Sequence, residues 1–305
     1  MTNPIRLEEI ISTLGQEFQV VGNPDVTVDK VSKPEEADRS SIVWFSSLPH
    51  DLQTLLDTCD AGIMILPLPL PEKIEVPRGK ALIFTRDSRL AIMTIMARFF
   101  RQRPDWGRHP TAVIHPQAVI AKDVHIGPNS YVGKCTIGSG SILYGNNFIY
   151  DGVTIGNDVT IHAGTVIGTD GFGYQPDEKE HWLKFEHLGG VEIGNGVEIG
   201  SNTCIDRGTL GNTKIGDGTK IDNLVHIAHN VQIGRHCLVI AHAMIGGSCI
   251  IGDFAWISPN AGILQKQQIG EHAIVGLGAV VIRDVPANET WAGVPARKME
   301  QKPNP

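Results

Sequence analysis

The chain has 305 residues, of which 34 are Gly and only 6% are aromatic. Its 26 basic and 33 acidic residues give a net charge of −7, which argues against a general nucleic-acid binder, because such proteins normally carry a basic excess. No apolar stretch approaches the roughly 18 residues of a membrane span, and the first residues lack the apolar core of a signal peptide, so a cytoplasmic location is expected. Five scattered cysteines without a CxxC pair predict reduced thiols.

Residues 1–102 predict a small α/β domain, because short apolar strands alternate with amphipathic helical stretches. Helices are expected at 6–15 and 87–100, and strands at 27–32, 41–45, 61–66 and 80–85. The segment 43–50 brings an aromatic side chain, hydroxyls and a His together around a turn, although burial in a core is the simpler interpretation of Trp44 by itself. Residues 103–112 have the composition of a linker.

An aliphatic residue recurs every six positions from Ile215 to Val281 without interruption. The same period holds in shorter runs at 114–132, 143–167 and 193–205. A period of six fits neither a helix nor simple strand alternation, but it fits a solenoid with three flat sides, about 18 residues per coil and coils about 4.8 Å apart. The sequence therefore predicts a mainly β fold, a parallel β-helix of about eight coils over 113–285, followed by a short tail at 286–305.

The repeat is interrupted by a long excursion at 168–192 and by a shorter one at 206–214. Loops that leave a rigid scaffold often hold ligand contacts. Phe172 and Tyr174 lie in the longer excursion, outside the hexads, and we assign them to ligand binding. For the distal part of this excursion, a flap that stabilises a trimer is an equally good interpretation.

Two residues of the uninterrupted run form a candidate reaction site. His229 and Gly247 are 18 positions apart, so they are expected to stack one coil above the other, about 4.8 Å apart. This separation suits a His base beside a backbone N–H that stabilises an oxyanion. A metal site is not expected, since His226, His229, His236 and His242 include no pair with this spacing.

Several motifs resemble one protein family. The DGFGY sequence of the longer excursion, and the run CIDRGTLGNTKIGDGTKIDNLVHIAHNVQIG at 204–234, are similar to the UDP-3-O-(3-hydroxyacyl)glucosamine N-acyltransferases of lipid A biosynthesis. The resemblance extends from about residue 5 to about residue 297 and implies a left-handed parallel β-helix of hexapeptide repeats. It also implies a homotrimer with active sites between subunits. Members of this family transfer an acyl group from the phosphopantetheine thioester of acyl carrier protein to the 2-amine of the UDP-sugar, with no bound cofactor.

The resemblance assigns roles to individual residues. It implies that His229 is the general base, that the Gly247 amide holds the oxyanion, and that Asp222 and Asn223 form the polar pair of the IDN motif. Asp222 is expected to orient the imidazole through its other ring nitrogen. Substrate binding is implied for Trp44, which would stack on uracil in the N-terminal domain, and for Ser47, His50, Phe172, Tyr174, Asn230 and Lys266.

Three of these positions depart from the family pattern. Ser47 stands where the family has a uracil-bonding Asn, His50 where it has a second aromatic residue, and Lys266 where it has a second functional His. The chain also ends soon after WAGVPARKM at 291–299, where the family usually adds helices that contact the carrier protein. These departures favour an alternative, a nucleotide-amino-sugar N-acetyltransferase that uses acetyl-CoA. A further alternative is a non-catalytic β-helix protein that binds a sugar nucleotide.

Overall fold

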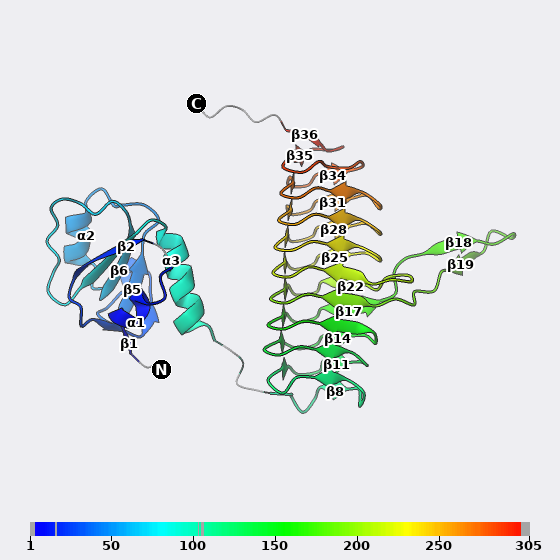
Figure 1. Ribbon diagram of the computed structural model, residues 1–305, viewed down its shortest axis with the longest axis horizontal. Coiled ribbons are helices and arrows are strands. Elements are labelled where there is room, and N and C mark those ends of the chain that lie inside the picture. Colours follow the sequence, from blue (N-terminus) through cyan, green and yellow to red (C-terminus); the bar gives the residue numbers. More distant parts are fainter. Residues whose placement is uncertain (1–3, 16, 103, 105–106, 300–305) are drawn as a thin grey trace. The chain divides into compact units, whose positions relative to one another are not determined.

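The computed structural model of Figure 1 describes residues 4–15, 17–102, 104 and 107–299. The chain divides into two compact units, residues 1–103 and 104–305. Parts of the predicted linker and of the predicted tail therefore lie outside the described residues. Among the described residues, no helix is long and apolar enough to cross a membrane.

The N-terminal unit is a five-stranded sheet with helices on both faces (Figure 1). The strands, in sheet order, are β2 (Phe18–Gly22), β7 (Ala81–Thr85), β6 (Ile63–Pro67), β5 (Ser41–Trp44) and β4 (Lys30–Val31), and all but β2 run parallel. The helices are α1 (Leu7–Ile11), α2 (Leu52–Thr58) and α3 (Ser88–Ile95), with a π-helical turn at Met96–Phe100 and a 3-10 turn at Pro34–Glu36. A small ladder joins β1 (Ile5–Arg6) to β3 (Thr27–Val28). Strand β2 and helix α2 were not predicted from the sequence.

Alternation along the strands builds two cores in this unit. On β6, Ile63 and Ile65 pack toward α1 and α3, whereas Met64 and Leu66 pack toward α2. Each strand thus covers both faces of the sheet with apolar side chains, as parallel strands between two helical layers do.

The C-terminal unit is a solenoid of three parallel sheets, which we call faces 1, 2 and 3 (Figure 1). Face 1 contains β10 (His125–Ile126), β13 (Ile142–Leu143), β16 (Thr160–Ile161), β21 (Glu198–Ile199), β24 (Lys220–Ile221), β27 (Leu238–Val239), β30 (Trp256–Ile257), β33 (Ile274–Val275), β35 (Thr290–Ala292) and the antiparallel β36 (Arg297–Lys298). Face 2 contains β8 (Val113–Ile114), β11 (Tyr131–Val132), β14 (Phe148–Ile149), β17 (Val166–Thr169), β22 (Cys204–Asp206), β25 (His226–Ile227), β28 (Met244–Ile245), β31 (Gly262–Ile263) and β34 (Val280–Val281). Face 3 contains β9 (Val119–Ile120), β12 (Thr136–Ile137), β15 (Val153–Ile155), β20 (Val191–Ile193), β23 (Thr213–Ile215), β26 (Gln232–Ile233), β29 (Ile250–Ile251) and β32 (Gln268–Ile269).

The hexad residues fill the interior, as the sequence predicts. Ile227 pairs with Ile245, which lies 18 residues further along the chain, and both are fully buried. At the corners, residues such as Asn230 and Ser248 adopt positive φ values of 61°, which turn the chain from one face to the next. The predicted fold class, a mainly β parallel β-helix of hexapeptide repeats, is confirmed.

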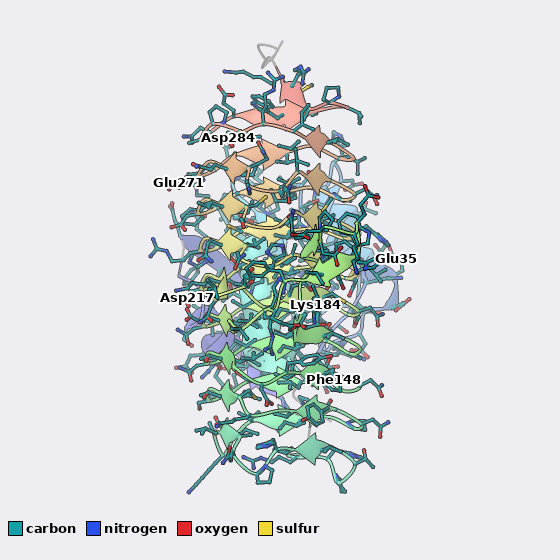
Figure 2. The ribbon with its side chains drawn as sticks, turned by 90° about the vertical axis from the view of Figure 1, so that its right-hand side faces the viewer. Glu35, Phe148, Lys184, Asp217, Glu271 and Asp284 are labelled. Atoms are coloured by element: carbon teal, nitrogen blue, oxygen red, sulfur yellow. The ribbon has the colours of Figure 1, made fainter. Side chains whose placement is uncertain are left out.

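Each coil has three corners, named here by the faces they join. Asp222 lies at the 1–2 corner, His229 at the 2–3 corner and Asp217 at the 3–1 corner. In Figure 2, Asp217 and Glu271 of the 3–1 corner lie along one edge of the solenoid.

The longer excursion leaves the solenoid after β17 and returns at β20. It forms an antiparallel hairpin of β18 (Tyr174–Pro176) and β19 (Trp182–Lys184), which extends away from the coils in Figure 1. The shorter excursion connects β22 to β23. Both excursions interrupt the coils next to the 2–3 corner, and this position brings them to His229.

Candidate active site

His229 lies at the 2–3 corner, two residues after the inward Ile227 of β25. One coil further, the Ser248 N–H donates to the His229 carbonyl (2.9 Å), and the Lys266 N–H donates to the Gly247 carbonyl (2.9 Å). A Cβ built on Gly247 would lie 2.8 Å from both Cε1 and Nε2 of His229. The predicted stacking of His229 and Gly247 is therefore present, and one edge of the imidazole faces the Gly247 backbone.

The Gly247 N–H lacks the acceptor that other corners provide. At two other corners, a side-chain oxygen of the next coil accepts the equivalent N–H: Asp253 accepts from Arg235 (2.8 Å) and Asn223 from Ser201 (2.6 Å). Among the described residues, none accepts a hydrogen bond from the Gly247 N–H. The donor is thus left for an acceptor that the chain does not supply, and a developing oxyanion is such a group.

The second ring nitrogen of His229 contacts Asn230. The Nδ2 atom of Asn230 lies 2.9 Å from His229 Nδ1 and 2.9 Å from the Thr209 hydroxyl, while Asn230 Oδ1 accepts the Thr209 backbone N–H (2.7 Å). Thr209 therefore determines which end of the amide faces the imidazole. Because an amide nitrogen only donates, His229 Nδ1 is the acceptor, and in the neutral ring the proton is on Nε2.

Within one chain, Asp222 does not make the contact to the imidazole that was expected of it. Asp222 accepts hydrogen bonds from the N–H groups of Asn223 (2.7 Å) and Ala241 (3.2 Å) and lies at the 1–2 corner, across face 2 from His229. Within one chain, Asn230 and not Asp222 bonds to the imidazole.

Asp222 and His229 line two separate hollows. Asp222 and Asn223 line a groove of about 640 Å³ together with His162, Glu198, Gly200, Lys220, Ile221, Leu238, Val239 and Ile240. His229 lines a pocket of about 260 Å³ together with Gly173, Tyr174, Gln175, Phe185, His187 and Thr209. No residue is common to the two linings, so within one chain Asp222 and His229 face different hollows.

The surroundings of His229 favour its neutral form. Its pKa is lowered below the ordinary value by burial, and further by the charges of His187 and His226. Nearby, burial and then the charge of Asp170 raise the pKa of Asp206 to about 7, and Asp206 Oδ2 lies 3.7 Å from His226 Nε2. A neutral imidazole at neutral pH is the state that a general base requires.

The longer excursion contributes residues that the sequence did not single out. His187 is buried, with its ring centroid 5.1 Å from that of His229, and Gly171 lies against both rings. Gly171 belongs to the DGFGY motif, which gave it no role of its own. No pattern marked His187, because the excursion has no period from which its fold could be inferred. Of the two predicted aromatic contacts, Tyr174 lines the His229 pocket, whereas Phe172 lines only a neighbouring apolar pocket of about 550 Å³ with Tyr174 and Trp182.

Replacing Gly171 by Ala is expected to lower kcat about 10- to 100-fold while the solenoid stays folded. The new Cβ would lie 2.7 Å from His229 Cβ and Cδ2, so the base must shift, and shifts near 1 Å in an active site have effects of this size. Initial rates with saturating substrates measure the loss. Gly211→Ala is the matched control, since Gly211 is exposed in the shorter excursion and its Cβ would meet nothing within 4 Å. Equal activity of the two variants would contradict this geometry.

The remaining predicted residues lie elsewhere. Lys266 is exposed at the 2–3 corner, one coil beyond Ser248. In the N-terminal unit, Trp44 ends β5 half-buried against the core, and Ser47 and His50 are exposed in the loop that follows. A cleft of about 590 Å³ beside that loop, at the carboxyl ends of the parallel strands, is lined by Ser46, Pro67, Arg86, Asp87, Ser88, Arg89 and Leu90. Ligands of parallel sheets bind at this edge, a rule that would have directed attention to Arg86 and Arg89.

No metal centre is apparent in the described part of the chain, where no three His, Cys, Asp or Glu side chains are grouped to hold an ion. The five cysteines are free thiols.

Comparison with known proteins gives consistent matches. The family model for bacterial transferase hexapeptide repeats (six repeats) matches residues 134–169 and 212–247. A protein named UDP-3-O-acylglucosamine N-acyltransferase from Marinomonas sp. (strain MWYL1) is 37% identical over 212 residues, which cover 60% of this chain and 59% of that protein. The chain thus spans about three fifths of the length of the curated relatives that it matches.

Solved structures match over a similar share of the chain. A UDP-N-acetylglucosamine acyltransferase from Bacteroides fragilis 9343 is 32% identical with a TM-score of 0.57, and the match covers 63% of this chain and 73% of that one. LpxA from Acinetobacter baumannii is 30% identical with a TM-score of 0.58 and the same coverage.

Proposed function

Because the chain belongs to the hexapeptide-repeat acyltransferases, and is related to proteins named UDP-3-O-acylglucosamine N-acyltransferase, we propose that it transfers an acyl group to the amine of a UDP-amino sugar. The observation that carries the proposal is the imidazole of His229 beside the unpaired N–H of Gly247. The acceptor is UDP-3-O-acylglucosamine, and the donor is a 3-hydroxyacyl thioester on acyl carrier protein. The reaction belongs to lipid A synthesis.

The chemistry is direct transfer. The lone pair of the 2-amine attacks the thioester carbon, and His229 Nε2 takes a proton from the attacking nitrogen. The negative oxygen of the tetrahedral intermediate accepts from the Gly247 N–H, a contact typically worth about 3 kcal/mol. The carbon–sulfur bond then breaks, the imidazolium returns the proton to the thiolate, and the products are an amide and a thiol.

Base catalysis at Nε2 requires a change at Asn230. Nε2 accepts a proton only when the ring proton is on Nδ1, and Nδ1–H then needs an acceptor. Turning the Asn230 amide over presents Oδ1 to Nδ1–H and releases the Thr209 N–H, from which Oδ1 accepts a hydrogen bond in the structure. Thr209 and Asn230 thus couple the shorter excursion to the tautomer of the base.

An apolar pocket that suits the acyl chain lies beside the reaction centre. Phe172, Tyr174 and Trp182 line the pocket of about 550 Å³ that adjoins the His229 pocket through Tyr174. An acyl chain gains free energy there, at about 0.8 kcal/mol for each buried methylene, whereas an acetyl group gains almost none. This apolar surface favours a long acyl donor over acetyl-CoA.

The other substrate contacts follow from the family resemblance. Trp44, Ser47 and His50 bind the uracil in the N-terminal unit, and Lys266 contacts the substrate at the 2–3 corner. The working form is a homotrimer, in which the 1–2 corner of a neighbour brings Asp222 and Asn223 to His229.

The donor is tested by product mass. The protein is incubated with UDP-3-O-acylglucosamine and either 3-hydroxyacyl carrier-protein thioesters of several chain lengths or acetyl-CoA. We expect a mass gain of one hydroxyacyl group and at least a tenfold preference for it over acetyl, about 1.4 kcal/mol in transition-state binding. A gain of one acetyl group alone would establish the acetyltransferase alternative, and no product with any donor would contradict the proposal.

A further inference from the structure

His187, in the segment that leads from β19 back to β20, is a buried side chain that the proposed mechanism does not use. Its exposed fraction is 4%, and both ring nitrogens are covered by the chain itself without a hydrogen-bond partner among the described residues. Such a group loses its hydration and gains no protein hydrogen bond, which costs free energy. An apolar side chain would fill the same space without that cost.

The placement of the ring relates it to the proposed base. The His187 and His229 rings meet edge to face, with centroids 5.1 Å apart and an angle of 67° between their planes. Gly171 fits between them: a Cβ there would lie 2.8 Å from His187 Nε2 and 2.7 Å from His229 Cδ2. His229 is thus held on one side by His187 and Gly171 and faces Gly247 with another edge.

We propose that His187 is a positioning residue for His229, whose ring holds the imidazole of the base toward Gly247. The inference rests on the proposed function, because it gives His187 a role only through the base. It explains why an imidazole occupies a position that its own hydrogen bonds do not justify.

Charged groups around the pair provide a second readout of the contact. Asp170 of the longer excursion interacts by charge with His187, and His226 of β25 interacts by charge with His229. Lys184 and Arg207 both pair with Asp170, and Asp206 lies beside His226. After burial, the charge of His187 is the largest influence that lowers the pKa of His229. Removing His187 therefore raises that pKa toward its ordinary value.

Two substitutions separate packing from charge. His187→Phe keeps a flat ring against His229 and removes the charge, so kcat at high pH should stay within about threefold of wild type while the acid limb of kcat/KM moves to higher pH. His187→Leu removes both the flat ring and the charge. The acid limb of kcat/KM again moves to higher pH, and kcat at high pH falls about tenfold, while KM for both substrates stays within about twofold of wild type. His181→Phe, on an exposed residue of the same hairpin, is the control and should leave profile and rate unchanged.

The outcomes distinguish this inference from the proposed function. NMR titration of ¹³C-labelled imidazoles, with His229→Gln used to assign the His229 signal, follows the base without any substrate. An acid limb and a His229 titration unmoved in His187→Phe would overturn the inference, as would a wild-type kcat in His187→Leu. Wild-type protein that forms no product would instead overturn the proposed function, and the NMR titration would still report on the pair.

Discussion

Replacing His229 by Gln is expected to lower kcat about 10²- to 10⁴-fold and to change KM for either substrate little. The loss is that of a general base, which contributes rate enhancements of this size. The remaining rate reflects the Gly247 N–H and the bound geometry, which the substitution leaves in place. Stopped assays that weigh the N-acylated product, run with saturating UDP-3-O-acylglucosamine and acyl carrier-protein thioester, measure the effect.

Folding does not confound this result. The His229 backbone carbonyl accepts from Ser248 whichever side chain is present, so the coil stays paired, and thermal unfolding of His229→Gln should match that of wild type. His272→Gln is the control, because His272 is exposed at the 3–1 corner, where it stacks on Phe254 and lies 3.6 Å from the Glu271 carboxylate. A wild-type rate in folded His229→Gln protein would locate the base elsewhere and revive a non-catalytic role.

Mixing two inactive variants should restore about a quarter of the wild-type activity. Asp222→Ala and His229→Ala are each expected to lose 99% or more of kcat, since each removes one half of the proposed site, a loss of about 100-fold. Asp222 and His229 occupy different corners of one chain and line different hollows, so the proposed site in the trimer takes one residue from each of two subunits. In random trimers, about one interface in four joins an intact His229 to an intact Asp222.

The trimers are made by co-expressing the two variants in equal amounts and are purified through one affinity tag that both variants carry, so that their composition stays random. A mixture of His229→Ala with His229→Gln is the control, because no interface then has the base and no activity returns. Recovery no greater than that of the parent variants would place both residues in one subunit's site or exclude Asp222 from the reaction. A monomer by light scattering would also contradict the shared site.

The hexad was sufficient to predict the solenoid from the sequence. Aliphatic residues at every sixth position can all be buried only if three hexads form one coil, as they do between Ile227 and Ile245. This requirement determines the coil length and hence which residues stack. The position of Gly247 beside His229 follows from the same arithmetic. In the N-terminal unit, by contrast, β2 was missed because it is a partly exposed edge strand without the continuous apolar run of β6 and β7. Helix α2 was missed because its seven residues are too few to show a helical period.

Only the tertiary structure decided the side-chain contacts made where the repeat is interrupted and where one corner of the coil differs from another. The sequence by itself determined the β-helix, the column that joins His229 to Gly247, and the family, because each depends on spacing or motif along the chain. It did not determine the partner of His229 Nδ1, which is Asn230 held by Thr209, nor the separation of Asp222 from the base. The contact of His187 with His229 could not be predicted from the sequence for the same physical reason. It reaches His229 through the return of an aperiodic excursion onto the coils, and that path is set by packing rather than by any pattern in the sequence.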